Sequence, residues 1–268
     1  MKIMIRREAA LLTQGKVINL PDRVEAVLSE DTLLNGNVRL RQPREGFRAA
    51  IDTVLLAAAV PATSGQKILE LGTGSGAAAL CLAQRVEGVK ITGIDVNPKA
   101  IALAIENIQL NKAAEKIDVT RGDVADRLPS QFDAAFDQVM MNPPYLPDSS
   151  SHVSPNPDRA LATMEAGADL KRWLKYGHDA LRHKGYLTVI HRADRLDEVI
   201  QCLSPNLGGV TVFPLWPRGG EEAKRVIIQL RKGVRTPARI LSGLAIHNQD
   251  GSYTGAAATV LRGAALTL

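Results

Sequence analysis

The stretch Lys67-Ile68-Leu69-Glu70-Leu71-Gly72-Thr73-Gly74-Ser75-Gly76 joins a short apolar run to a loop that contains three glycines. The run has the length and composition of a buried strand. Glycines in the loop let the backbone turn sharply and approach a ligand closely. An alanine-rich segment follows at once, so the loop leads into a helix N-terminus, which is a favourable place for an anionic ligand. The stretch therefore predicts a strand, a ligand-binding loop and a helix.

The same alternation of strand and helix patterns continues to about Lys232. It predicts an α/β fold with a mostly parallel sheet covered by helices on both faces. The last two expected strands are separated only by a Pro- and Gly-containing segment, Trp216 to Lys224, so the last strand is expected to be antiparallel. The expected strands are Lys67–Leu71, Lys90–Asp95, Ile117–Arg121, Gln138–Asn142, Gly185–His191, Val210–Leu215 and Arg225–Leu230, and the expected helices are Ala77–Val86, Pro98–Asn111, Gly167–His183 and Asp194–Ser204.

The chain is expected to have three parts. Residues 1–64 form an N-terminal extension, a candidate substrate-recognition subdomain, in which Asn35-Gly36 between apolar-alternating arms predicts a hairpin. Residues 65–233 form the α/β core. Residues 234–268 form a C-terminal appendage, whose role the pattern leaves open.

Composition favours a soluble protein with an anionic partner. Hydrophobic residues make up 45% of the chain and charged residues 23%, as in ordinary globular proteins. Lys and Arg total 33 against 28 Asp and Glu, which gives a net charge of +5 and mildly favours a polyanion. Cys81 and Cys202 stand alone, without the spacing of a metal site, and read as core residues in a reducing compartment.

Neither a leader nor a membrane span is evident in this pattern. No apolar region follows the early basic residues of Met1 to Glu8, as a secretory signal would require. The longest apolar run, Val54 to Val60, ends at Pro61 and is too short to cross a bilayer. We therefore expect a cytoplasmic protein that does not enter membranes.

Acidic residues close the second and third expected strands. Asp95 can accept hydrogen bonds from two ribose hydroxyls, and Asp123 can hold an adenine amino group. The spacing Gly72-x-Gly74-x-Gly76 differs by one residue from the fingerprint of a dinucleotide site, the immediate rival. Taken singly, Asp95 and Asp123 also fit helix caps, and Glu70 fits a buried structural acid. Their occurrence at successive strand ends favours a nucleoside-containing cofactor.

The tetrapeptide Asn142-Pro143-Pro144-Tyr145 follows the apolar run Val139-Met140-Met141. Two consecutive prolines exclude a helix and a continuing sheet ladder, because each lacks a backbone N–H and restricts φ. A strand is thus expected to end at Asn142, on the sheet edge where ligands bind in open α/β folds. An amide that donates and accepts hydrogen bonds, next to an aromatic ring, suits a planar amino group. Taken alone, the tetrapeptide fits a simple turn equally well.

Together these residues resemble the class I S-adenosylmethionine-dependent methyltransferases with an Asn-Pro-Pro-Tyr motif, over residues 67–232. The resemblance implies a Rossmann-like seven-stranded methyltransferase sheet, S-adenosyl-L-methionine as cofactor, no metal, and methyl transfer to a planar nitrogen. It implies that Asn142 and the carbonyl of Pro143 accept hydrogen bonds from the target amino group, while Tyr145 stacks on the base. The implied cofactor-binding residues are Glu70, Gly72, Thr73, Gly74, Gly76, Asp95, Asp123 and Asn142.

The flanks are similar to those of the bacterial tRNA adenine-N6 methyltransferases that modify the purine beside the anticodon of a valine tRNA. This similarity implies tRNA or another structured RNA as substrate. Among the basic residues of the flanks, Arg48 and Arg218 are the candidate contacts. Methylation of a glutamine N5 in a translation factor is the first alternative, because that amide is also a planar nitrogen. A non-catalytic RNA-binding protein with this fold is the second. The similar stretches are Gln42–Ala57, Ser154–Leu161, Ile190–Ala193 and Pro217–Arg225.

Overall fold

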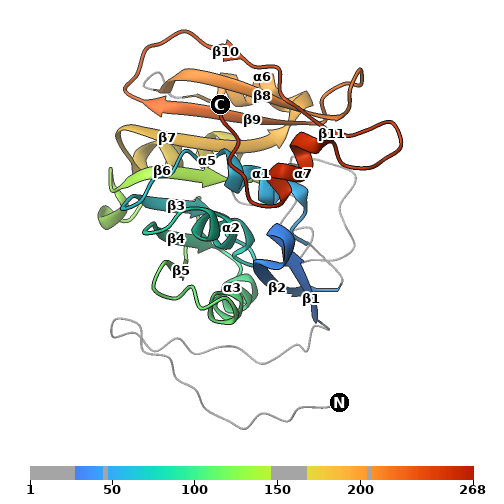
Figure 1. Cartoon of the computed structure of the whole chain (residues 1–268). Coiled ribbons are helices and arrows are strands. Elements are labelled where there is room, and N and C mark those ends of the chain that lie inside the picture. Colours follow the sequence, from blue (N-terminus) through green and yellow to red (C-terminus); the bar gives the residue numbers. More distant parts are fainter. Residues whose placement is uncertain (1–27, 45–47, 146–167, 204–206) are drawn as a thin grey trace, which may run out of the picture.

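A computed structural model describes residues 28–44, 48–145, 168–203 and 207–268 of the chain. The flanking stretch Ser154–Leu161 therefore lies outside the described residues, as do Gly46 and Phe47. A central nine-stranded sheet organises the described part of the chain, and a separate two-stranded sheet lies beside it (Figure 1).

The elements follow one another as strands and helices in alternation through the core. The strands are β1 (Leu28–Leu33), β2 (Val38–Pro43), β3 (Lys67–Leu71), β4 (Lys90–Asp95), β5 (Ile117–Arg121), β6 (Phe136–Met141), β7 (Leu181–Arg192), β8 (Leu207–Arg218), β9 (Arg225–Lys232), β10 (Arg239–Ile240) and β11 (Leu244–His247). The helices are α1 (Ile51–Ala59), α2 (Ala77–Arg85), α3 (Pro98–Leu110), α5 (Leu170–Ala180), α6 (Leu196–Gln201) and α7 (Gly255–Leu261), with short 3-10 turns at Leu34–Gly36, Ser130–Phe132 and Ala193–Arg195.

The predicted sheet is confirmed. Strands β5, β4, β3, β6 and β7 are parallel neighbours in that order. The last core strand, β9, inserts antiparallel between β7 and β8. Two short strands, β10 and β11, extend the sheet beyond the seven that were predicted, because both pair with β8. The C-terminal segment thus continues the core sheet.

Several predicted elements differ in length from those observed. Strand β7 begins at Leu181 rather than Gly185, because Leu181 pairs with Phe136, and the extra residues of β7 before Tyr186 form an irregularity in the register. The preceding helix α5 accordingly ends at Ala180. The helix expected over Asp194–Ser204 is a 3-10 turn followed by the shorter α6.

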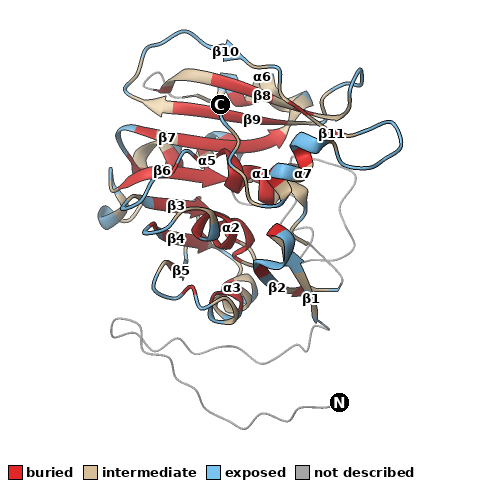
Figure 2. Cartoon of the chain, in the orientation of Figure 1, coloured by how far each residue is buried: buried red, intermediate tan, exposed pale blue. Residues whose placement is uncertain are grey.

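Apolar layers cover both faces of the sheet. In β6, the side chain of Met140 belongs to a cluster with α1, α2 and α7, whereas Val139 and Met141 belong to one with α5 and α6. This is the alternation expected of a strand buried on both sides. Figure 2 shows the central strands as buried and the short outer strand β10 as exposed.

The terminal parts of the described chain pack on the core. Backbone groups of Arg39 and Arg41 in strand β2 exchange hydrogen bonds with the side-chain amides of Asn111 and Asn107, at and near the end of α3. At the other end, the backbone N–H of Leu266 donates to Ala58 in α1 at 2.8 Å. Helix α1 therefore lies between the core sheet and the C-terminal segment.

None of the helices in the described residues combines the length and apolarity needed to span a bilayer.

Candidate active site

The ends of the parallel strands are level with one another. Leu71, the last residue of β3, pairs with Ile94 on one side and with Met141 on the other. The residues that follow these three, Gly72, Asp95 and Asn142, therefore lie at the same edge of the sheet. Neighbouring strands are about 4.8 Å apart, so Asp95 and Asn142 flank the glycine loop within about 10 Å of each other.

The glycine loop has the backbone geometry of a ligand cradle. Gly72 and Gly74 have φ angles of +70° and +55°, in the left-handed region that favours glycine. A Cβ at Gly72 would come within 2.9 Å of the Trp173 ring, whereas one at Gly74 would meet nothing within 4 Å. Gly76 is the N-cap residue of helix α2. It has no side chain that could accept a hydrogen bond from the backbone N–H groups of the first turn. The loop is thus supported by Trp173 on one side and open on the other.

Two carboxylates hold this loop in place. Oδ2 of Asp95 accepts a hydrogen bond from the backbone N–H of Gly74 at 2.8 Å, and Oδ1 accepts one from Asn97 at 2.9 Å. The hydroxyl of Thr73 donates to Oε2 of buried Glu70 at 2.7 Å. Burial raises the pKa of Glu70 to about 8 and also raises that of Asp95. Glu70 is therefore largely neutral at pH 7, which fits a supporting position under the loop.

Asp123 lies two residues beyond Arg121, which pairs with Asp95 across β4 and β5. Its Oδ1 accepts a hydrogen bond from the backbone N–H of Ala125 at 2.8 Å, so it shapes the following turn. Its other carboxylate oxygen has no described protein partner. The open loop and the carboxylates at the ends of β4 and β5 together fit the cradle of a nucleoside-containing cofactor.

A second group of side chains surrounds Tyr145, which follows β6. The Tyr145 hydroxyl donates to Oδ1 of Asn142 and also lies 3.3 Å from Oδ2 of Asp52. The same Asp52 oxygen accepts a hydrogen bond from Nε of Arg225 at 2.8 Å. The Arg225 guanidinium lies 4.9 Å from the centroid of the Tyr145 ring. Residues far apart in the chain thus converge on one phenol.

Further contacts fix the backbone and ring of Tyr145. The His191 ring makes an edge-to-face contact with it at 5.2 Å. Nη1 of Arg195 donates to the Tyr145 carbonyl at 3.0 Å. Burial lowers the pKa of His191 to about 4, so this ring is neutral at physiological pH. Burial also raises the pKa of Tyr145 well above its ordinary value, so the phenol keeps its proton.

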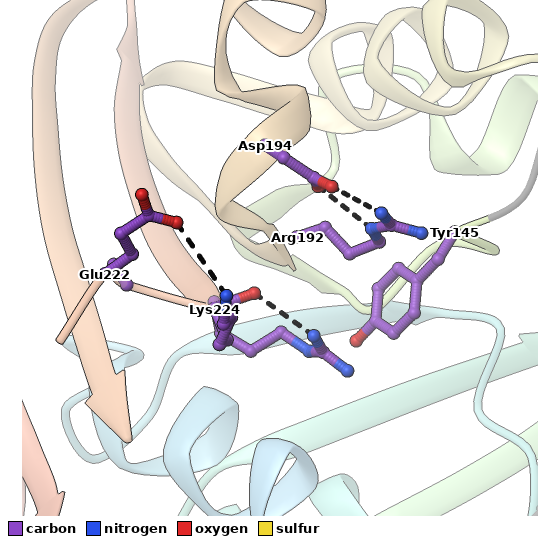
Figure 3. A pocket seen from close by; sticks show the side chains of 7 residues that line it. Tyr145, Arg192, Asp194, Glu222 and Lys224 are labelled. Carbon is purple, nitrogen blue, oxygen red and sulfur yellow. Dashed lines mark hydrogen bonds and ion pairs between the residues drawn. The ribbon is translucent and has the colours of Figure 1, made fainter. Parts of the chain in front are cut away.

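A cavity of about 490 Å³ opens beside Tyr145 (Figure 3). Its walls come from the end of β7 and from the segment between β8 and β9. Three basic side chains line these walls. Arg192 pairs with Asp194, Lys224 lies near Glu222, and Arg225 donates to the carbonyl of Lys224. Figure 3 shows the Arg192–Asp194 pair on one side of the cavity and Glu222 with Lys224 on another. The lining residues are Tyr145, Arg192, Asp194, Glu222, Ala223, Lys224 and Arg225.

The two predicted RNA contacts lie outside this lining. The Arg48 guanidinium donates to Ser29, to the carbonyl of Pro43 and to Asp31, and so ties the hairpin to the start of α1. Arg218 forms an ion pair with Glu221 at 3.2 Å. Contacts of Arg48 and Arg218 with a substrate remain predictions.

The family model of the Methyltransferase small domain matches residues 48–195, which is more than half of the chain. The chain belongs to this family. The match begins just before α1 and ends after β7, so it includes the glycine loop and, around Tyr145, Asp52, Asn142, His191 and Arg195 but not Arg225. The prediction of a methyltransferase that uses S-adenosylmethionine is confirmed for the family.

Individual relatives agree with membership of the methyltransferase family. A tRNA1(Val) (adenine(37)-N6)-methyltransferase of Actinobacillus pleuropneumoniae is 29% identical over 207 residues, 76% of this chain and 84% of that protein. One of the same description from Aeromonas hydrophila is 28% identical over 214 residues, 79% of this chain and 87% of that protein. The structure of a predicted O-methyltransferase from Agrobacterium tumefaciens gives a TM-score of 0.67 at 25% identity, over 80% of this chain and 98% of that one.

Sequence reasoning missed three side chains of this methyltransferase site. Trp173 supports the glycine loop, and its signal was its rarity, since the chain has only two tryptophans. Asp52 and Arg225 contact Tyr145. Both lie in stretches that resemble the tRNA-modifying enzymes, but those stretches gave no hint that the two residues meet.

Proposed function

We propose that this protein transfers a methyl group from S-adenosylmethionine to the exocyclic N6 of an adenine in tRNA. The observation that carries the proposal is the placement of Asn142 and Tyr145 between the glycine cradle and a cation-lined cavity. A methyl donor in the cradle and a base in the cavity would meet at Asn142.

The acceptor side performs the chemistry by positioning. An amino group conjugated to a purine is a poor nucleophile, because its lone pair is delocalised into the ring. Oδ1 of Asn142 and the carbonyl of Pro143 accept hydrogen bonds from its two N–H groups, which favours a pyramidal nitrogen with the lone pair localised on it. The ring of Tyr145 stacks on the base and holds it in line for attack, a contribution that can account for much of the rate.

The cofactor side binds the donor. The backbone of Gly72 and Gly74 allows close approach, Asp95 accepts from ribose hydroxyls, and Asp123 accepts from the adenine amino group. S-adenosylmethionine supplies an electrophilic methyl group on a sulfonium. Glu70 and Thr73 support the loop from below. The neutral, protonated Tyr145 and neutral His191 leave no strong base in the described site, so the proton leaves after methyl transfer.

RNA is favoured over a protein substrate by the walls of the cavity. Arg192, Lys224 and Arg225 line it, and cations at such a position suit a phosphate backbone. The volume of about 490 Å³ lies in the range of small-molecule pockets and suits one extruded nucleoside. The curated relatives named above are tRNA1(Val) enzymes acting on adenine 37, which supports that nucleotide as the target.

A transfer assay tests the proposal. The protein is incubated with donor labelled in the methyl group and with an unmodified transcript of tRNA1(Val). The matched control is the same transcript with guanine at position 37. We expect label in the first RNA only, and nuclease digestion followed by chromatography should give N6-methyladenosine.

Two results would contradict the proposal. Label at N1 of adenine would exclude N6 as the acceptor atom. Label on the control transcript would exclude adenine 37 as the target. Label in a translation factor rather than RNA, recovered as N5-methylglutamine, would support the glutamine alternative, which uses the same motif.

A further inference from the structure

The hydrogen bond between Tyr145 and Asn142 competes with one that the proposed reaction needs. The Tyr145 hydroxyl donates to Oδ1 of Asn142. The same oxygen is proposed to accept a hydrogen bond from the target amino group. An amide oxygen has two lone pairs and can accept from both donors, but the hydroxyl already holds one of them and restricts the direction from which the amino group can approach.

A second acceptor for the same hydroxyl lies within reach. Oδ2 of Asp52 is 3.3 Å from the Tyr145 oxygen, at the long end of the hydrogen-bond range. A small rotation of the phenolic O–H would direct its proton to this carboxylate without moving the ring. The Asp52 side chain is 17% exposed, so little water competes for the carboxylate.

Arg225 fixes this second acceptor. Its Nε donates to Oδ2 of Asp52 at 2.8 Å, and its guanidinium lies over the Tyr145 ring at 4.9 Å. Arg225, which lies far from Asp52 in the sequence, thus holds the Asp52 carboxylate beside the Tyr145 hydroxyl. Asp52 has no role in the proposed cofactor cradle, which is built from the loops after β3, β4 and β5.

We propose that Asp52 is a positioning residue that receives the Tyr145 hydroxyl when the target amino group takes its place on Asn142. The hydroxyl holds the amide of Asn142 in place before the substrate arrives, and Asp52 prevents the displaced hydroxyl from being left without a partner. This inference rests on the proposed function and adds a residue of α1 to the acceptor site.

A purely structural role for Asp52 is the alternative. An acidic residue in the first turn of α1 favours the helix, and its ion pair with Arg225 joins α1 to β9. Such a role would be independent of the Tyr145 hydroxyl. The proposed role requires that hydroxyl, and this difference makes the two readings separable.

A double-mutant cycle separates them. Wild type, Asp52→Ala, Tyr145→Phe and the double variant are compared in kcat/KM for the tRNA. We expect Asp52→Ala to lower kcat/KM about tenfold when Tyr145 is present, because a displaced hydroxyl without an acceptor is costly. In the Phe background the same substitution should change it less than about twofold.

Asp52→Asn is the conservative control. A carboxamide oxygen at the position of Oδ2 can accept from both Tyr145 and Arg225, so this variant should keep at least about half of the wild-type value. Thermal melting and calorimetry with S-adenosylhomocysteine should show folded variants with unchanged cofactor affinity.

An equal loss from Asp52→Ala in both backgrounds would overturn the inference, as would failure of Asp52→Asn to restore activity. If the wild type methylates a glutamine instead of RNA, the proposed function fails. The cycle is then run on that acceptor, whose amide also needs Asn142, and additivity there would again reject the role of Asp52.

Discussion

The two halves of the candidate site are built in different ways. On the cofactor side, contacts are made by backbone and by residues close in sequence, such as Thr73 with Glu70 and Gly74 with Asp95. On the acceptor side, contacts join distant segments, as Asp52 and Arg225 lie 173 positions apart. The first half is a local product of strand ends and glycines, whereas the second exists only once the fold brings α1, β6 and β9 together.

This difference predicts separable functions. Substitutions on the cofactor side should change donor affinity and leave RNA affinity alone. Substitutions on the acceptor side should change transfer or RNA affinity and leave donor affinity alone. Variants that mix the two effects would show that the halves act as one unit.

The largest effect is expected from Asn142→Ala. It removes the oxygen that accepts from the target amino group, so kcat should fall at least about a hundredfold, as for other groups that act mainly in the transition state. Single-turnover methyl transfer measures the loss. Donor affinity by calorimetry should stay within about threefold of wild type.

Unchanged transfer by Asn142→Ala would remove Asn142 from the acceptor role. A parallel loss of donor affinity would instead assign Asn142 chiefly to the cofactor, the other role predicted for it. Either result would break the division between the two halves.

Asp95→Ala tests the opposite half. The variant loses the carboxylate that aligns Gly74 and that is proposed to accept from the ribose, so the Kd for S-adenosylmethionine should rise about thirtyfold. Calorimetry measures this Kd, and filter binding of tRNA should be unchanged. A Kd equal to that of wild type would reject the ribose role of Asp95 and leave only its loop contacts.

Glu70 sharpens the comparison through pH. Burial raises the pKa of its carboxyl from 4.5 to about 8 in the folded protein. The folded state then binds the proton more tightly, so this contribution to the free energy of unfolding is complete below about pH 4.5 and is lost as pH rises through about 8. Stability of wild type should therefore fall over this window.

Glu70→Gln removes this dependence, because glutamine stays neutral. Urea unfolding at about pH 5 and about pH 8 should show wild type losing about 3 kcal/mol relative to the variant. Equal pH dependence in both proteins would show that Glu70 is ionised in the folded state and is not merely a neutral support of the loop.

The sequence predicts the cofactor side of the site better than the acceptor side, because the contacts of the cofactor side are local. The glycine loop, Asp95, Asp123 and Asn142 could be placed at one edge because each lies at or just beyond the end of an expected strand, and parallel strand ends meet there. The reversed last strand was predictable from the short segment before Arg225. By contrast, β10 and β11 are only a few residues long, and their pairing with β8 leaves no periodic pattern.

The contacts of Tyr145 could not be predicted for a further reason. A salt bridge between α1 and β9 depends on the packing of α1 against the sheet, and no local preference of Asp52 or Arg225 encodes it. The same holds for Arg48, whose charge suggested RNA but whose guanidinium is engaged within the hairpin.

The smallest effect is expected from the rim of the cavity. Lys224 is 66% exposed and lies 3.8 Å from Glu222, a weak pair at such a surface. If it contacts an RNA phosphate, Lys224→Ala should raise KM for tRNA about threefold, leave kcat unchanged, and lower the salt slope of binding by about one. The matched control is Lys175→Ala on α5, which removes a similarly exposed cation away from the cavity. Equal changes in both variants would mean that net charge alone attracts the RNA. Lys224 would then not belong to the acceptor side of the site, which would extend no further than Tyr145 and Arg225.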